Sequence, residues 1–447
     1  MRRGISSVQL KNNLTYRKLT AFFIPLGVSA SLTSVTHVII NGTMSRGDHA
    51  AFIIACYAVA MSVFGIIERP MIVFRQTSST LVSDRKSFKT LGIFFLYVLA
   101  GIMVISSIIA FTSLGDWMYV KMFNATPDMV NAISITFQVL IIVIIFSGIR
   151  GLYQGIIIRQ LATNWLTIGV IVRLAAMFLL AFLFILFDYI TSVSGALIFL
   201  LGMLIECIVS VYKGNSLLKT ELNEAAKYPL KTKEISSFYF PLVYYFMMQT
   251  LLIPIIYILL AKSADIEMSI ASFALAFSIT NLILSFFMYT HQLVLQFYKV
   301  DKKKVVRFFI LSSIIPTLLM VILCYTPVGM IFMQKVMGAD EQLSITTLAV
   351  LKFFIIKTLI FPWVDFLNGF LMLSRKTTRM LLAQIANLIV VVITLIIFVR
   401  LWPEQNGING SIAASIGEFA GFIIVAVIVY LMSDHYNKRR RLKRKSS

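Results

Sequence analysis

The hydrophobic residues of the chain fall into long runs separated by short polar segments. Runs such as LIIVIIFSGI and LIVVVITLIIFV are apolar on every side, whereas the strands of a membrane β-barrel would alternate apolar and polar residues. A helix needs about 20 apolar residues to cross the hydrocarbon core of a bilayer. The pattern therefore predicts twelve spanning helices, at 17–41, 49–74, 89–113, 130–158, 163–187, 193–213, 236–260, 268–297, 305–328, 344–373, 377–400 and 410–433.

The composition agrees with an all-α polytopic membrane protein. Of the 447 residues, 59% are hydrophobic and 13% are charged, which is too apolar for a soluble core and shell. The first apolar segment has full length and no small-residue cleavage site follows it, so we expect it to be retained. Cys56, Cys207 and Cys324 fall within predicted helices, which leaves no disulfide framework and no metal-ligand spacing.

The net charge of +21 could indicate a nucleic-acid partner, but the basic residues are distributed as in a membrane protein. The polar segments between the predicted helices alternate in charge. The N-terminus and every second segment after it hold thirty Lys and Arg residues in total, and the other loops hold five. This positive-inside pattern predicts that both termini are cytoplasmic. We interpret the basic tail as a topology anchor attracted to anionic lipid headgroups, so the expected partner is the bilayer and not nucleic acid.

The chain contains an internal repeat. A shift of 216 positions places FFIPL (22–26) on FYFPL (238–242) and YAVA on FALA, and a shift of 214 places GLYQGIIIRQLAT on DFLNGFLMLSRKT. Two six-helix halves that both enter from the cytoplasm are related by an axis along the membrane normal. The predicted organisation is an N-terminal lobe (1–213), a cytoplasmic linker (214–235), a C-terminal lobe (236–433) and a basic tail (434–447).

Ionisable residues within predicted helices are candidates for function, because each costs roughly 2.5 to 3.5 kcal/mol at mid-membrane. Glu68, Arg69, Arg150, Arg173 and Glu206 lie at a similar depth from the cytoplasmic ends of their helices. They could form a structural network in which Arg173 pairs with Glu206, and Glu68 pairs with Arg150 or Arg69. Three bases against two acids leave one positive charge, which favours a cavity for an anionic group.

The second half carries a different set of charges. Lys357 and Asp365 lie eight residues apart on one helical face, with Asn368 close to it. Lys352 matches Glu418 in depth, which suggests a structural pair and leaves Lys357 as the better ligand candidate. The predicted substrate-binding residues are therefore Glu68, Arg69, Arg150, Arg173, Lys357, Asp365 and Asn368.

The segment FGIIERPMIVFR places an acid, a base and a proline inside a predicted helix. The positions that the repeat sets opposite Glu68-Arg69-Pro70 are Leu284-Ser285-Phe286, so the fold does not require the charges. Proline removes a backbone hydrogen bond and bends its helix, which favours a cavity-lining, bendable site. Alternatively, the helix ends near Ile67 and the charges lie at the interface.

Prolines also supply the hinge candidates, which are Pro25, Pro70, Pro241 and Pro362. His37 and His291 could carry protons, but ordinary hydrogen-bonded roles are open to both, and we rank them below the Arg and Lys residues. No P-loop, HExxH motif or Gly-rich nucleotide turn is present. We therefore expect neither an enzyme nor a bound cofactor.

The twelve helices in two halves, the segment IPLGVSASLTSVTHVIINGTMSR and the turns Gln154-Gly155 and Asn368-Gly369 together resemble the MOP superfamily. This group contains the MATE multidrug exporters and the flippases for lipid-linked oligosaccharides. GLYQGIIIRQLAT and FFIPLG look most like the progressive ankylosis branch. The resemblance implies a V-shaped pair of six-helix lobes, alternating access and export from the cytoplasm, driven in the drug exporters by Na⁺ or H⁺. Many MATE transporters carry an acid in the first helix, where this chain has His37 and Asn41.

We expect a secondary transporter or flippase of the cell membrane that exports a polar or amphipathic substrate, anionic or lipid-linked, with a monomer as the simplest assembly. One alternative is a multidrug exporter coupled to Na⁺ or H⁺, with Asp365 as a carboxylate for the cation. Another is a membrane scaffold that moves nothing and would tolerate Gln at Arg69, Arg150 and Lys357.

Overall fold

The structure is a computed structural model that describes residues 14–160, 162, 164–220, 230–374 and 378–445. Within these ranges it gives no side-chain description for 25, 26, 29, 241, 245, 248, 249, 378 and 433–445. The described residues form helices and turns, with no strand among them. The all-α fold class is confirmed.

The described part of the first half of the chain contains seven helices. They are α2 (Tyr16–Met44), α3 (Ala50–Leu81), α4 (Arg85–Phe111), α5 (Ser113–Phe123), α6 (Pro127–Arg159), α7 (Asn164–Leu186) and α8 (Ser192–Thr220). The second half is more interrupted. It contains α9 (Thr232–Thr250), α10 (Leu252–Leu260), α11 (Ile266–Ser285), α12 (Thr290–Phe297), α13 (Lys302–Ser313), α14 (Ile315–Tyr325), α15 (Pro327–Ile331), the π-helix η1 (Phe332–Met337), α16 (Glu341–Leu373), α17 (Thr378–Leu401), the 3₁₀ helix η2 (Pro403–Gln405) and α18 (Gly407–Lys445).

Ten helices of the described part of the chain are long and apolar enough to cross a membrane. They correspond to ten of the twelve predicted spans. The other two, 17–41 and 236–260, correspond to α2 and to the α9–α10 pair, which are helical but not among those ten. Ten of the twelve predicted spans are thus supported.

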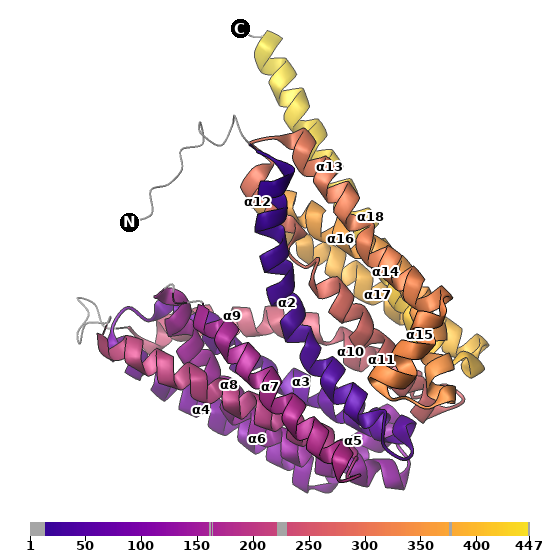
Figure 1. Cartoon of the computed structure of the whole chain (residues 1–447). Helices are drawn as coiled ribbons and strands as arrows, with labels where there is room; N and C mark the ends of the chain where they lie inside the picture. The colour runs from indigo at the N-terminus through magenta and orange to yellow at the C-terminus, as the bar shows by residue number, and fades with distance from the viewer. Residues whose placement is uncertain (1–13, 161, 163, 221–229, 375–377, 446–447) are drawn as a thin grey trace.

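The helices form two lobes. In the first lobe α6 packs against α3, α4 and α8, and α7 packs against α8; in the second, α16 packs against α11, α12, α14 and α18, and α17 against α18. Figure 1 shows the lobes meeting at the end where α2 finishes, beside α15, and diverging toward the end where α2 begins and α18 finishes. We call the meeting point the closed end. The basic-residue pattern predicts that it is the outer end.

The first helix of each half crosses between the lobes. Phe23 near the start of α2 packs edge-to-face on Phe286 in the second lobe, with 5.7 Å between ring centroids. Tyr239 in α9 donates its hydroxyl hydrogen to the carbonyl oxygen of Pro70 in the first lobe, at 2.9 Å. The two pairs are equivalent by the repeat, because Phe23 and Tyr239 are 216 positions apart and so are Pro70 and Phe286. The repeat is therefore present in the tertiary contacts as well as in the sequence.

The glycines of the two repeated turns allow close helix approach. A Cβ on Gly155 would lie 2.4 Å from Cβ of Ser78 in α3, and one on Gly369 would lie 2.9 Å from Cβ of Val294 in α12. Ser78 and Val294 are also equivalent by the shift of 216. Small residues let helices in a membrane pack backbone to backbone, which is the physical role of Gly155 and Gly369.

Helix α3 continues through Pro70 to Leu81. The alternative in which this helix ends near Ile67 is therefore wrong, and Glu68 and Arg69 lie within the helix. The helix that the repeat sets opposite α3 is interrupted instead, between α11 and α12 at residues 286–289. A separate break lies at Leu251 between α9 and α10, three residues before Pro254, where proline cannot donate to the carbonyl one turn earlier.

Gly155→Ala should lower the unfolding midpoint of the detergent-purified protein. The added Cβ would overlap Ser78 and the carbonyl oxygen of Arg75, and overpacking of this kind costs about 1–3 kcal/mol. The control is Gly101→Ala in α4, where an added Cβ meets nothing within 4 Å and alanine favours the helix by up to about 1 kcal/mol. Equal midpoints for the two variants would contradict close packing at Gly155.

Candidate functional site

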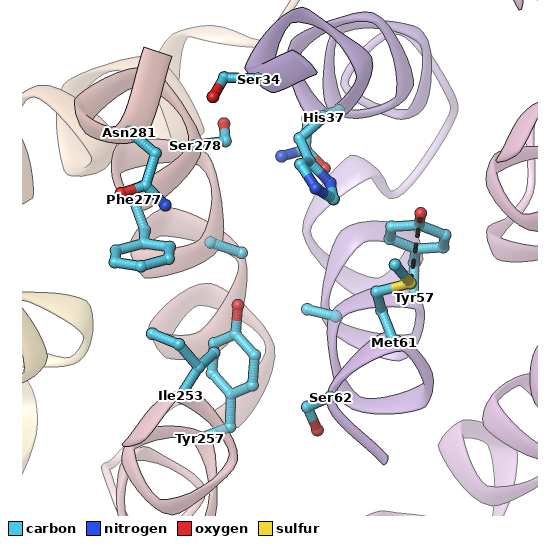
Figure 2. A pocket seen from close by; sticks show the side chains of 13 residues that line it. Ser34, His37, Tyr57, Met61, Ser62, Ile253, Tyr257, Phe277, Ser278 and Asn281 are labelled. Atoms are coloured by element: carbon cyan, nitrogen blue, oxygen red, sulfur yellow. Dashed lines mark hydrogen bonds between the residues drawn. The ribbon is translucent and has the colours of Figure 1, made fainter. Parts of the chain in front are cut away.

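A cavity of about 170 Å³ lies between the lobes, where α2 and α3 face α10 and α11. Figure 2 shows Ser34, His37, Met61 and Ser62 on one side and Tyr257, Phe277, Ser278 and Asn281 on the other. Asn41, Tyr57, Ala58, Ile253 and Ala274 complete the lining. We call this space the central cavity.

Its walls are equivalent by the repeat. Ala58 and Ala274, Met61 and Phe277, and Ser62 and Ser278 are each separated by 216 positions. The cavity therefore lies on the axis that relates the two halves. A site on such an axis can be exposed to either side of the membrane when the lobes rock against one another.

A second cavity, of about 460 Å³, continues from the first and shares His37, Met61, Ser62 and Ile253 with it. It adds Gly65, Glu68, Arg69, Phe199, Thr250 and Pro254. Seven residues of α3 separate Met61 from Glu68, or about 10 Å along the helix axis. We call this part the charged chamber. It lies on the side of the central cavity away from the closed end.

Within the charged chamber Glu68 is 7% exposed, and its Oε1 accepts a short hydrogen bond from the hydroxyl of Ser147. Arg69 also lines the chamber. Its Nε is buried and has no hydrogen-bond partner among the described residues. A buried donor without a partner costs free energy, so a ligand that accepts this hydrogen bond gains from a group already positioned.

Arg150 and Arg173 lie beside the chamber and share one carboxylate. Oε2 of Glu206 is 2.8 Å from Nη1 of Arg150 and 2.6 Å from Nη1 of Arg173, and Oε1 accepts from Gln154 at 2.9 Å. Arg173 also donates to the hydroxyl of Thr36 in α2, at 2.8 Å. The predicted Arg173–Glu206 pair is confirmed. The network joins α2 to the body of the first lobe.

The buried charges of the second lobe correct one predicted pairing. Glu418 pairs with Lys357 at 3.8 Å, so the predicted pair of Lys352 and Glu418 is wrong. Lys352 instead lies 5.6 Å from the centroid of the Tyr325 ring. The two lysines are five residues apart in α16, an offset that turns them to different sides of the helix. Only Lys357 faces α18.

Lys357 is separated from the central cavity by one aromatic ring. Its ammonium lies 5.3 Å from the centroid of Phe277, and Phe277 lines the cavity. Asp365 accepts hydrogen bonds from the Thr290 hydroxyl at 2.7 Å and from Nδ1 of His291 at 3.0 Å. Asp365 and Asn368 line neither the cavity nor the chamber.

The prolines predicted as hinges lie at varied places. Pro70 and Pro362 stand inside α3 and α16, and the carbonyl oxygen of each accepts a side-chain hydrogen bond, from Tyr239 and from Thr290 respectively. Pro25 and Pro241 lie within α2 and α9, and their side chains are outside the described part of the structure.

Of the seven predicted substrate ligands, Glu68 and Arg69 line the connected cavities. Most of the lining is uncharged and was not predicted. It includes His37, a residue that the sequence ranks below the Arg and Lys residues. The sequence does contain one signal for this lining: Ser62 and Ser278 are polar residues at equivalent positions of two apolar helices. The predicted ligands rest instead on the depth of charged residues in the membrane, and depth does not distinguish a cavity wall from a lobe interior.

No protein-family model matches the sequence, and no curated protein matches it. The fold, in contrast, has solved counterparts. An inward-facing multidrug resistance MATE family transporter of the MOP superfamily is 13% identical, with 90% of this chain and 96% of that chain covered and a TM-score of 0.70. The lipid II flippase MurJ in an inward closed conformation is 14% identical, with coverages of 91% and 87% and a TM-score of 0.68.

An outward-facing MATE family transporter is 13% identical over 96% of this chain and 98% of that chain, with a lower TM-score of 0.54. The protein thus has the fold of the MATE and MurJ members of the MOP superfamily, as the resemblance implied.

Glu206→Gln should lower the unfolding midpoint in detergent more than Arg173→Met. The Gln variant leaves two buried guanidinium groups without a counter-charge, and loss of one partner of a buried ion pair costs about 3–5 kcal/mol. Arg173→Met leaves the Arg150–Glu206 pair in place. Glu404→Gln, at an exposed site in η2, is the matched control and should leave the unfolding midpoint unchanged. A smaller loss in Glu206→Gln than in Arg173→Met would contradict the shared carboxylate.

Proposed function

We propose that the protein is a secondary transporter or flippase that moves an anionic, amphipathic organic substrate out of the cytoplasm by alternating access. The observation that carries the proposal is the pair of connected cavities between the lobes, with the unpartnered Nε of Arg69 in the charged chamber. The lobes diverge toward the end where α2 begins and α18 finishes, and we propose that the substrate is loaded from the cytoplasm at this end. We place the protein in the cell membrane, with both termini cytoplasmic.

The charge balance beside the chamber favours an anion. Arg69, Arg150 and Arg173 face two acids, and each has a buried Nε without a partner among the described residues. Arg150 and Arg173 are ion-paired to Glu206 and do not line the chamber, and Glu68 has a hydroxyl donor in Ser147. Arg69 is therefore the base whose free donor can reach a ligand in the chamber, and a carboxylate or phosphate oxygen is the group best suited to accept from it. Lys357 lies behind Phe277, but its charge is balanced by Glu418.

An apolar groove favours a substrate with a hydrocarbon chain. It has a volume of about 790 Å³ and lies between α2 and the α11, α13 and α14 helices of the second lobe. Phe23, Ile24, Ile283, Phe286 and Leu319 contribute to its lining. The groove and the charged chamber share no lining residue, and the groove lies against α2 on the side of the second lobe. One is suited to a chain and the other to an anionic head.

The multidrug exporter remains the second candidate because the same central cavity is lined by Tyr57, Phe277 and Tyr257, and aromatic rings attract organic cations. In either case we propose coupling to Na⁺ or H⁺ and no bound cofactor. The carboxylate of Asp365, which His291 approaches from α12, is our candidate for the coupling ion.

Ligands should identify the substrate class by stabilising the purified protein, because binding to the native state adds about 2.7 kcal/mol at 100 times Kd. We expect anionic lipid-linked phosphates or organic anions to raise the unfolding midpoint, and this rise to vanish in Arg69→Gln. Lys352→Gln also removes a cation from a helix but not from the cavity, and should retain the rise. Stabilisation by cationic drugs, unchanged in Arg69→Gln, would favour the multidrug exporter instead.

A bulky substitution in the groove should separate chain-bearing ligands from soluble ones. Thr20→Trp fills space that Thr20 borders, so it should weaken binding of lipid-linked anions about tenfold while soluble anions bind as before. Val104→Trp, on the exposed face of α4, is the control for a bulky residue toward lipid. Equal binding of a lipid-linked anion to both variants would argue for a soluble substrate.

A further inference from the structure

Arg46 follows α2 at the closed end of the molecule, and its guanidinium reaches the second lobe. Nη1 donates to the carbonyl oxygen of Met337 at 2.8 Å, and Nη2 donates to those of Val336 and Lys335 at 2.6 and 3.2 Å. Nη1 also donates to the carbonyl oxygen of Gly42 in its own helix. One side chain therefore joins the last turn of α2 to the last turn of η1.

The four acceptors share one property. Each is a backbone carbonyl near a helix C-terminus, where the final carbonyls lack amide partners and carry the negative end of the helix dipole. A guanidinium presents several N–H donors in a fixed, planar fork, which an ammonium cannot reproduce. Arg46 thus supplies hydrogen bonds that neither helix end supplies for itself.

The residue after η1 makes room for this contact. Gly338 has φ of +74°, and a Cβ there would lie 2.2 Å from Cγ and 2.6 Å from Nε of Arg46. Any other residue would meet both a left-handed backbone and the arginine side chain. Gly338 is therefore required by the position of Arg46.

The contact crosses between the lobes. The end of α2 belongs to the first lobe: a Cβ on Gly195 of α8 would lie 2.7 Å from Sδ of Met44, and Thr36 accepts from Arg173. The helix η1 leads directly into α16 of the second lobe. Figure 1 shows the end of α2 beside α15, where the lobes meet. The hydrogen bonds of Arg46 therefore exist only while the two lobes are together at this end.

We propose that Arg46 is a positioning residue of the transport cycle, a latch that holds the outer end of the central cavity closed in the inward-facing state. This role goes beyond the proposed function, since it concerns the lobes and not the substrate. Contacts made in one of two states shift the population toward that state by their difference in free energy. Opening the outer end requires all three hydrogen bonds to η1 to break.

The latch is suited to repeated opening because two of its three carbonyls on η1 belong to the exposed residues Lys335 and Val336, while Met337 is buried. Val336 is 54% exposed, so water can replace the guanidinium when the lobes separate. The net value of such exchanged hydrogen bonds is much smaller than their strength in isolation. The latch biases the equilibrium without preventing the outward-facing state.

The test is the distance between spin labels on the two lobes. Lys121→Cys in α5 and Glu404→Cys in η2 place labels at exposed sites, in a background with the three native cysteines replaced by serine. Arg46→Ala should increase several-fold the fraction of molecules in which the two labels are farther apart. Gly338→Ala should do the same with Arg46 intact, and Arg46→Lys should give an intermediate share because an ammonium cannot serve all the carbonyls.

Lys335→Ala is the matched control, since it removes a positive charge from η1 but keeps the carbonyl that Arg46 uses. It should leave the distances as in the parent. An unchanged distance distribution in Arg46→Ala and Gly338→Ala would overturn the latch, as would an equal change in Lys335→Ala. The measurement needs no substrate, so its failure is distinct from failure of the proposed transport function.

Discussion

The constraint on which the structure depends is the cost of a polar or charged group without a partner in hydrocarbon. It explains why Glu206 holds two guanidinium groups and why Lys357 meets Glu418. Each lobe satisfies its own charges in its interior. The lobes can then move relative to each other without breaking buried ion pairs.

Against this background the charged chamber is an exception. The Nε of Arg69 remains buried and unpartnered among the described residues, beside a space large enough for a ligand. A satisfied network stabilises a lobe, whereas an unsatisfied donor beside a cavity is suited to binding. Arg150 and Arg173 also have an unpartnered Nε, but both are ion-paired to Glu206 and neither lines the chamber. This difference separates Arg69, as a candidate ligand, from structural charges of the same type.

The repeat gives the molecule two equivalent frameworks that have diverged in chemistry. Both halves keep the crossing first helix, the close glycine contact and the small polar residue of the central cavity. They differ in their charges, since Glu68 and Arg69 line the charged chamber and the repeat sets Leu284 and Ser285 opposite them. In the proposed function the shared framework would provide alternating access, and this divergence would provide selectivity.

The sequence by itself determined the helical class, ten of the spanning helices, the repeat and the Arg173–Glu206 pair. These follow from composition, from the length of apolar runs and from depth along a helix, which are all properties of local sequence. It did not determine that Lys357 rather than Lys352 meets Glu418, that His37 and Ser278 face one cavity, or that Arg46 reaches η1. Those contacts join segments up to 291 residues apart, and only the packing of one helix against another decides which face of each helix is turned toward its neighbour.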